Sequence, residues 1–264
     1  DLIVVTSDVS TSAGLDRYRK TLPDQYLDVG IAEQNMIGIA AGLASENYKV
    51  VTTTFSPFQV LRCCEQIKMN LGYMHHKVCM VGLASGLSLG SLGYSHCSIE
   101  DIGILRSIPN INILSPADGL ETVKALDAAL LSENSCYIRL TGVSNNQIIY
   151  NKDYNFEIGK SIKLRDGDDV TIFCNGAIIN ECLKAAELFE KKNLSCGVVN
   201  MHTVKPIDIE AIKVSLKSKL IVTVEEHNII GGLGSAVSEC VSKFSKSPPQ
   251  LFLGVTFNYG LILG

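Results

Sequence analysis

Several features that define large classes of protein are missing from this sequence of 264 residues. No apolar run reaches the roughly 18–20 residues that cross a bilayer. The first residues also lack the basic region and long apolar segment of an export signal. Lys and Arg total 23 against 27 Asp and Glu, without a basic block that could neutralise a row of phosphates. We therefore expect a cytoplasmic protein that binds neither membranes nor nucleic acid.

Patterns typical of metal sites and disulfide frameworks are also missing. The nine cysteines are odd in number, include no Cys-x-x-Cys pair and lie mostly in apolar segments. Such cysteines are typical of reduced, buried side chains. Cys63 and Cys64 are adjacent and cannot both face one metal ion from a helix, which argues against a zinc site. We predict no metal ligands on this chain.

Short apolar runs alternate with longer stretches of helical periodicity, which predicts an α/β fold with mostly parallel sheets covered by helices. In the first half, strands are expected at 2–5, 49–54, 78–82, 111–114 and 136–140, and helices at 32–46, 57–71, 98–107 and 117–132.

A polar stretch near residues 142–160 interrupts this pattern, so we expect two α/β domains, over 1–145 and 160–264. In the second domain, an Asp-Gly turn predicts a β-hairpin between strands 160–164 and 170–173. Helices at about 178–192, 208–217 and 232–244 are expected to alternate with strands at 195–200, 220–225 and about 247–255.

Glu33 stands between the end of an expected strand and the first turn of a helix rich in small residues. In open α/β sheets, ligands bind at this edge. An acid in the first helical turn also complements the helix dipole. From the residues alone, this structural explanation and the ligand-binding explanation are equally good.

Six segments occur in the order and spacing of the transketolase family: DVGIAEQNMIGIAAGLA, TTTFSPFQVLRCCEQI, GYSHCSIEDIGILRSIPN, SPADGLET, YIRL and VEEHNIIGGLGSAVSE. The likeness covers about residues 1–250. The chain resembles the C-terminal section of a transketolase, made of the pyrimidine-binding domain and the C-terminal domain. This resemblance implies a transferase that uses thiamine diphosphate to move a ketol unit between sugars.

The family's diphosphate-binding motif is not found here. In transketolases, Mg²⁺ and the diphosphate are held through a Gly-Asp-Gly motif and a later Asn, because hard oxygen ligands suit this cation. The single Gly-Asp pair, Gly167-Asp168, lies in the expected turn, and Asn175 follows too closely. The resemblance therefore implies a split, two-subunit transketolase whose partner subunit carries the Mg²⁺ site, assembled as α₂β₂.

Four residues match cofactor positions of the family. Glu33 would be catalytic and hydrogen-bond N1′ of the aminopyrimidine, while Phe55 and Phe58 would pack on this ring. Asp8 would lie near the thiazolium. The structural alternatives are a strand-end turn for Asp8 and ordinary core packing for the two phenylalanines.

Three further residues match substrate positions. His96, in Gly93-Tyr94-Ser95-His96, would bind a sugar oxygen and take part in catalysis. Ser12 and Arg139 would contact the substrate phosphate, Arg139 through its fork of N–H donors. An N-cap for Ser12 and a surface ion pair for Arg139 are the structural alternatives.

The sequence also departs from the family pattern. Ser91 and Leu92 replace an acidic pair, Ala84 replaces a phosphate-binding His, and Leu61 stands where a third aromatic is common. These changes indicate an atypical sugar substrate.

Two other functions remain open. One is pyruvate decarboxylation, as in 1-deoxyxylulose-phosphate synthase or the beta subunit of a 2-oxoacid dehydrogenase, although His96 argues against the latter. The other is a catalytically silent assembly subunit, favoured by Leu92 and Ala84 but opposed by Glu33. The cluster Glu225-Glu226-His227 could bind a metal and the glycines at 231–234 an anion, but packing roles are favoured for both.

Overall fold

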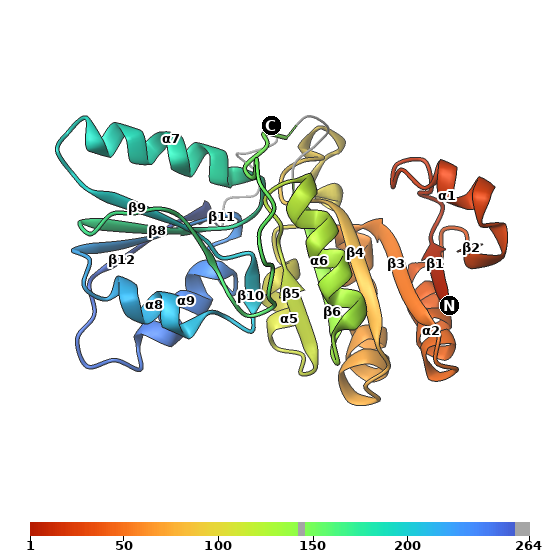
Figure 1. Cartoon of the computed structure of the whole chain (residues 1–264). Helices are drawn as coiled ribbons and strands as arrows, with labels where there is room; N and C mark the ends of the chain where they lie inside the picture. The colour runs from red at the N-terminus through yellow and green to blue at the C-terminus, as the bar shows by residue number, and fades with distance from the viewer. Residues whose placement is uncertain (142–145, 257–264) are drawn as a thin grey trace.

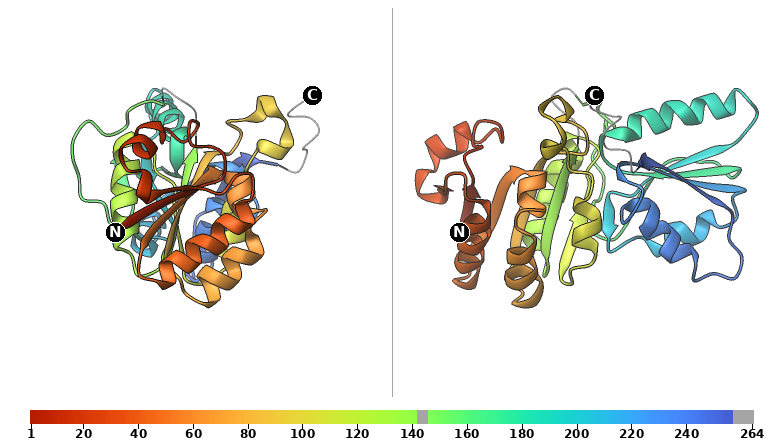
Figure 2. Two further views of the ribbon diagram at one scale, coloured as in Figure 1. Left: turned by 90° about the vertical axis from the view of Figure 1, so that its right-hand side faces the viewer. Right: turned by 180° about the vertical axis from the view of Figure 1, so that it is seen from behind.

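The computed structural model describes residues 1–141 and 146–256, so the expected domain limits at 145 and 264 lie outside the described residues. Two α/β units stand side by side, each built on its own sheet (Figures 1 and 2). The predicted fold class is confirmed, while the domain limits stay a prediction. No helix in the described part of the chain is long and apolar enough to cross a membrane.

The first sheet has seven strands in the order β10-β5-β6-β4-β3-β1-β2. All neighbours are parallel except β10 and β5. Its central strands are buried on both faces, as expected for a parallel sheet covered by helices. The strands are β1 (Leu2–Thr6), β2 (Tyr26–Asp28), β3 (Lys49–Phe55), β4 (Val78–Ser85), β5 (Ile111–Leu114), β6 (Ser135–Thr141) and β10 (Thr203–Lys205).

Helices cover both faces of this sheet. On one face, apolar residues of α2 (Glu33–Ser45), α5 (Asp101–Arg106) and the π-helix η2 (Ile67–Tyr73) join one core cluster. On the other face, α6 (Gly119–Leu131) and residues beside α1 (Asp16–Thr21) join a second. Asp118 caps α6 by accepting a hydrogen bond from the Glu121 N–H at 2.9 Å. Short 3₁₀ turns are η1 (Pro23–Gln25), η3 (Gly90–Leu92) and η4 (Tyr94–His96).

The continuous helix predicted over 57–71 is wrong. The structure instead has α3 (Ser56–Val60), a turn, α4 (Cys64–Gln66) and then η2. At the interruption, the Arg62 N–H bonds back five residues to the Pro57 carbonyl, 3.3 Å away. Such π-type bonds loosen the regular ladder and are frequent at functional sites. The apolar spacing of the sequence does not reveal this break.

The second sheet has the strand order β12-β11-β8-β9-β7. Its strands are β7 (Ile162–Arg165), β8 (Val170–Cys174), β9 (Cys196–Asn200), β11 (Leu220–Asn228) and β12 (Gln250–Val255). Its helices are α7 (Ile179–Glu190), which follows the 3₁₀ turn η5 (Gly176–Ile178), α8 (Ile209–Ser215) and α9 (Leu233–Val241). Apolar residues of all three helices are packed on the sheet.

The predicted hairpin between β7 and β8 is wrong, because β7 pairs antiparallel with β9, which lies between them. Ser195 holds the connecting loop through hydrogen bonds with Asp168 and Asp169 at 3.0 and 2.8 Å. A side chain at Gly167 would overlap the backbone of Cys196. The Asp-Gly segment therefore crosses the end of β9 instead of closing a hairpin.

Strand β10 links the two units, since it follows β9 in the chain yet pairs with β5 of the first sheet. The Ser115 N–H also donates to the His202 carbonyl at 2.7 Å. The sequence pattern did not predict this strand, which is three residues long.

Candidate active site

Glu33 begins α2 at the carboxyl end of β1, and its side chain is only 4% exposed. Ser7, near the end of β1, fixes the preceding loop: its hydroxyl donates to the Gly30 carbonyl at 2.6 Å and accepts from the Ala32 N–H at 3.1 Å. Gly30 has a φ of 71°, a conformation that glycine adopts readily. The local sequence thus aims a buried carboxylate at the sheet edge where ligands bind in open α/β folds.

Asp8 lies directly after Ser7 and is exposed. Its N–H donates to Asp28 Oδ1 at 3.0 Å, and its φ of 54° is in the left-handed region. Ala84, near the end of β4, also has a left-handed backbone, with a φ of 49°, although it is not a glycine. Backbone strain of this kind is frequent at functional sites. Asp8 and Ala84 lie at the same edge of the first sheet, but Asn47 and His75, at the opposite edge, are also left-handed.

Three aromatic rings meet beside this edge. Phe55 ends β3, Phe58 lies in α3 and His96 ends η4. The ring centroids of the Phe55–Phe58 and Phe55–His96 pairs lie 6.4 Å apart, and those of Phe58 and His96 lie 5.3 Å apart. Edge-to-face contacts of this kind fix the orientation of the rings.

Arg62 joins Glu33 to this aromatic group, and the sequence analysis missed it. Its Nη1 lies 2.7 Å from Glu33 Oε2, and its Cζ lies 4.3 Å from the Phe58 ring centroid. The signal that could have found it is spacing: Arg62 follows Phe58 by four residues in an expected helix, which places both on one face.

Cys63 lies close by but is unsuited to act as a nucleophile. Burial, and then the charge of Glu33, raise the pKa of this thiol to about 12. A neutral thiol is a poor nucleophile. Of these two neighbouring groups, the Glu33 carboxyl is therefore the better candidate for catalysis.

A cavity of about 400 Å³ opens next to Phe55 at the carboxyl ends of β3, β4 and β6. It brings together Ser12, Phe55 and Ala84, three positions that the sequence analysis singled out. Asp118 and Thr141 also line it. The other predicted site residues are not among its lining residues: Asp8, Glu33, Phe58, His96 and Arg139.

Arg139 is completely buried and does not reach this cavity. Its Nε donates to Asp101 Oδ2 at 2.8 Å, and its Nη2 donates to the carbonyls of Ser98 and Glu226 at 3.0 and 2.9 Å. Burial has the largest single effect and lowers the pKa of Arg139, but the charges of Asp101, Tyr137 and Glu226 and the hydrogen bond to Asp101 together outweigh it, so the pKa is raised overall. The predicted contact with a substrate phosphate stays a prediction, and this geometry does not support it.

The same buried network supports the turn that carries the phenylalanines. Asp101 accepts from the Tyr137 hydroxyl at 2.7 Å, and Tyr137 is 2.8 Å from Ser56 Oγ, at the start of α3. Burial and the Asp101 charge raise the pKa of Tyr137 well above its usual value. A side chain at Gly82 would overlap Ser56 and Tyr137, so glycine is needed where β4 passes this network.

The cluster Glu225-Glu226-His227 has structural partners. Glu225 accepts from the N–H groups of Leu233 and Gly234 at 2.6 and 2.8 Å, so its own carboxylate fills the glycine-rich entrance to α9. Glu226 accepts from the Leu87 N–H at 2.7 Å and ties the loop after β4 to the second unit. Within residues 1–141 and 146–256, no group of three or more His, Cys, Asp or Glu side chains could hold a metal ion.

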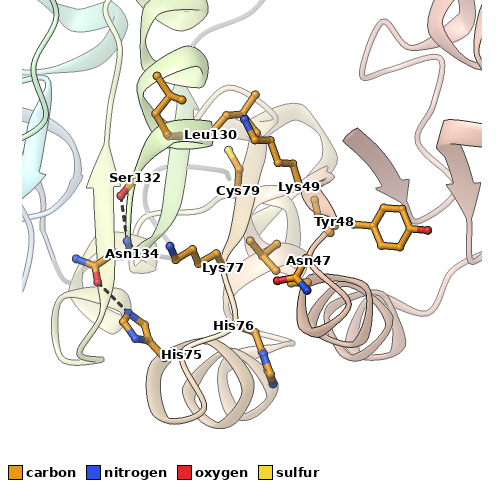
Figure 3. Close-up of a pocket in the computed structure, with 15 residues that line it drawn as sticks. Asn47, Tyr48, Lys49, His75, His76, Lys77, Cys79, Leu130, Ser132 and Asn134 are labelled. Carbon is orange, nitrogen blue, oxygen red and sulfur yellow. Dashed lines mark hydrogen bonds between the residues drawn. The ribbon is translucent and has the colours of Figure 1, made fainter. Parts of the chain in front are cut away.

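Another cavity, of about 450 Å³, lies at the opposite edge of the first sheet (Figure 3). Lys49, His75, His76 and Lys77 line it, at or just before the starts of β3 and β4. Its remaining wall includes the last turns of α2 and α6, whose carbonyl ends repel anions. The basic side chains would attract an anion and the helix ends would repel it, so the two effects work against each other. The carboxyl edge of the sheet therefore remains the better candidate site.

Comparison with known families decides the relationship. Residues 1–143 match the transketolase pyrimidine binding domain, and residues 159–257 match the transketolase C-terminal domain. The chain belongs to the transketolase family.

Its relatives include separate transketolase subunits. It is 36% identical over 244 residues to one subunit of the apulose-4-phosphate transketolase of Phocaeicola vulgatus, covering 92% of this chain and 78% of that protein. It is 36% identical over 243 residues to a 6-deoxy-6-sulfo-D-fructose transketolase subunit of a Clostridium species, covering 92% and 75%. A solved structure described as a split gene transketolase, inactive beta4 tetramer, matches with a TM-score of 0.89 and 34% identity, covering 99% of this chain and 85% of that one.

These findings confirm that the chain is a transketolase-like transferase subunit with the pyrimidine-binding and C-terminal domains. Membership of the transketolase family implies thiamine diphosphate as cofactor, and the names of the related subunits imply a partner chain. The site fits the pyrimidine part of this cofactor, because a nearly buried carboxylate stands beside flat aromatic side chains.

Proposed function

We propose that this chain is the pyrimidine-binding half of a two-subunit transketolase that transfers a ketol unit between sugars. The observation that carries this proposal is Glu33, a carboxylate buried at the first turn of α2 and linked through Arg62 to the Phe58 face. An aminopyrimidine needs a hydrogen-bonding acid at its ring nitrogen and apolar groups against its faces. Glu33, Phe55 and Phe58 would supply these.

Each side chain then has a distinct task. When bound, thiamine diphosphate supplies the nucleophilic carbon that attacks the donor carbonyl. Glu33 would hold or release a proton at ring N1′, and its burial would keep water from competing for it. Phe55 and Phe58 would orient the ring. His96, beside Phe58, would hydrogen-bond a sugar oxygen, with Asp8 and Ser12 at the open edge of the site.

The Mg²⁺ and diphosphate site would belong to the partner subunit. Two observations support this: the single Gly-Asp pair of the sequence, Gly167-Asp168, is not part of a Gly-Asp-Gly motif, and the related beta4 tetramer is described as inactive. Because the cofactor would bridge two chains, activity would require both. We propose an α₂β₂ assembly.

The sugar would differ from common pentose and hexose phosphates. Ala84 lines the cavity beside Phe55 without offering a polar group, and Ser91 and Leu92 are exposed in η3 without a carboxylate. The names of the relatives, which mention apulose-4-phosphate and 6-deoxy-6-sulfo-D-fructose, also favour an unusual ketose.

The test is to purify this chain with a partner chain that carries a Gly-Asp-Gly motif, and to add Mg²⁺ and thiamine diphosphate. The complex is then supplied with a panel of ketose donors and an aldehyde acceptor, and in parallel with pyruvate. Ketol transfer by the complex but by neither chain alone is expected. Release of carbon dioxide from pyruvate, without ketol transfer, would contradict the proposal.

A further inference from the structure

We propose that Arg62 is a placeholder for the cofactor: in the chain without cofactor, its guanidinium occupies the position of the aminopyrimidine and must leave when the cofactor binds. This inference rests on the proposed function of Glu33 and the phenylalanines.

Arg62 contacts the two side chains, Glu33 and Phe58, that the aminopyrimidine would contact. Its Nη1 donates to Glu33 Oε2 at 2.7 Å, and its Cζ lies 4.3 Å from the centroid of Phe58. A guanidinium is planar, carries N–H donors at its edge and stacks on aromatic faces. It therefore meets the same acid and the same ring face, but it donates to the ionised carboxylate, whereas ring N1′ would accept a hydrogen bond from the protonated acid.

The placeholder answers a physical need of the cofactor-free chain. The Glu33 side chain is 4% exposed, and a buried carboxylate without a partner is strongly unfavourable. Arg62 balances its charge in the cofactor-free chain; when the ring replaces the guanidinium, Glu33 would take up a proton from solvent and donate it in a hydrogen bond to N1′. The Arg62 guanidinium lies at the edge of the site, where water can still reach it.

Arg62 is also placed to move. Its side chain is 43% exposed, whereas that of Arg139, the buried arginine, is 1% exposed. Arg62 lies in the interruption between α3 and α4, outside a regular helical turn. A main-chain contact holds its backbone, since Gln34 Nε2 donates to the Arg62 carbonyl at 3.1 Å. The side chain can therefore swing toward solvent while the backbone stays in place.

Because the two occupants compete, the apparent affinity for the cofactor equals the intrinsic affinity multiplied by the fraction of molecules in which Arg62 is out of the site. A half-exposed ion pair and an exposed cation–π contact are both weak. Removing them should tighten cofactor binding by about two- to tenfold.

The experiment measures binding of thiamine diphosphate, with Mg²⁺, to the two-chain complex by equilibrium dialysis. The variants Arg62→Gln and Arg62→Met remove the cation, and Arg62→Met keeps an unbranched apolar chain. Arg165→Gln is the matched control, because it breaks an ion pair with Glu190 in the second unit, away from the site. Thermal unfolding without cofactor verifies that each variant is folded.

Both Arg62 variants should bind the cofactor about two- to tenfold more tightly than the unaltered complex, and the control should bind equally. Equal or weaker binding by the folded Arg62 variants would overturn the placeholder. Glu33→Gln separates this result from failure of the proposed function. If Glu33→Gln binds and turns over like the unaltered chain, the assignment of Glu33 is wrong. If only Glu33→Gln is impaired and the Arg62 variants are not tighter, the placeholder alone is wrong.

Discussion

Two arginine–carboxylate pairs of almost equal length lie in the first unit and differ in their surroundings. Arg62 and Glu33 are 2.7 Å apart at the sheet edge, with side-chain exposures of 43% and 4%. Arg139 and Asp101 are 2.8 Å apart in the interior, with exposures of 1% and 0%. Exposed pairs contribute little stability, whereas breaking a buried pair leaves an uncompensated charge. Contact distance alone therefore does not distinguish a replaceable pair from a structural one.

The surroundings explain how the buried pair serves the open one. Asp101 also accepts from Tyr137, which contacts Ser56 at the start of α3. The helix α3 carries Phe58, and the turn after it carries Arg62. The buried contacts of Asp101 and Tyr137 thus hold the start of α3 in place. Phe58 and Arg62 follow at the open edge of the sheet, where Arg62 can exchange its partners.

The substitution Glu33→Gln should show the largest difference between the open pair and the buried pair, because it should reduce activity strongly and stability only slightly. We expect its activity in the two-chain complex to fall by about 10²–10⁴-fold, because a neutral amide cannot transfer the proton. Its free energy of unfolding should change by less than about 1 kcal/mol, because a half-exposed pair is lost. Steady-state kinetics and urea unfolding measure both. Glu46→Gln, at the exposed end of the same helix, is the control, and a Glu33→Gln variant within twofold of normal activity would refute the role of Glu33.

The opposite pattern is expected for Asp101→Asn. The change leaves the Arg139 guanidinium buried without its counter-ion and should reduce the free energy of unfolding by about 3–5 kcal/mol. Urea unfolding of the chain alone measures this. Glu239→Gln breaks an exposed pair with Arg106 and should cost less than about 1 kcal/mol. Similar losses for the two variants would show that burial does not decide the strength of these pairs.

The pH dependence of stability tests the buried region around His202, where the two units join. His202 is fully buried, and burial lowers its pKa to about 4. Between about pH 6.5 and 4, the unfolded chain binds a proton at this histidine that the folded chain does not, so acid favours unfolding. This site should contribute a loss of about 3 kcal/mol as the pH falls across that range.

The measurement compares urea unfolding of the unaltered chain and His202→Gln at pH 7 and at about pH 4.5. The variant should lose less stability on acidification, because glutamine does not titrate. His75→Gln is the control, since His75 is exposed. An equal loss in all three proteins would rule out His202 as the source.

A pair of glycine substitutions gives the smallest expected effects. Gly82→Ala places a methyl group against Ser56 and Tyr137 and should cost about 1–3 kcal/mol of unfolding free energy. Gly38→Ala, in α2, meets no atom within 4 Å and should stabilise the chain by about 0.5–1 kcal/mol. Thermal and urea unfolding measure the two shifts, and a Gly82→Ala variant as stable as Gly38→Ala would show that the network tolerates displacement.

Several residues of the candidate site could be proposed from the sequence, because their positions depend on local features of the sequence. Glu33 begins the helix that follows a strand, Phe55 ends the next strand and Phe58 lies three residues later in the helix after it. Such positions follow from the order of the elements, because parallel strands share one carboxyl edge. Arg139 shows the limit of this reasoning. It also lies near the end of a strand, but the partners that bury it come from residues 98, 101 and 226.

The sequence by itself determined the alternation of strands and helices, the position of the acid at the first turn of α2 and the family segments, because these depend on local periodicity and residue type. Only the tertiary structure decided that β7 joins β9, that β10 crosses to the first sheet, and that Arg62 contacts Glu33. These features depend on packing between segments far apart in the chain. Local propensity cannot specify them, because the same residues could form other pairings until the complete core excludes them.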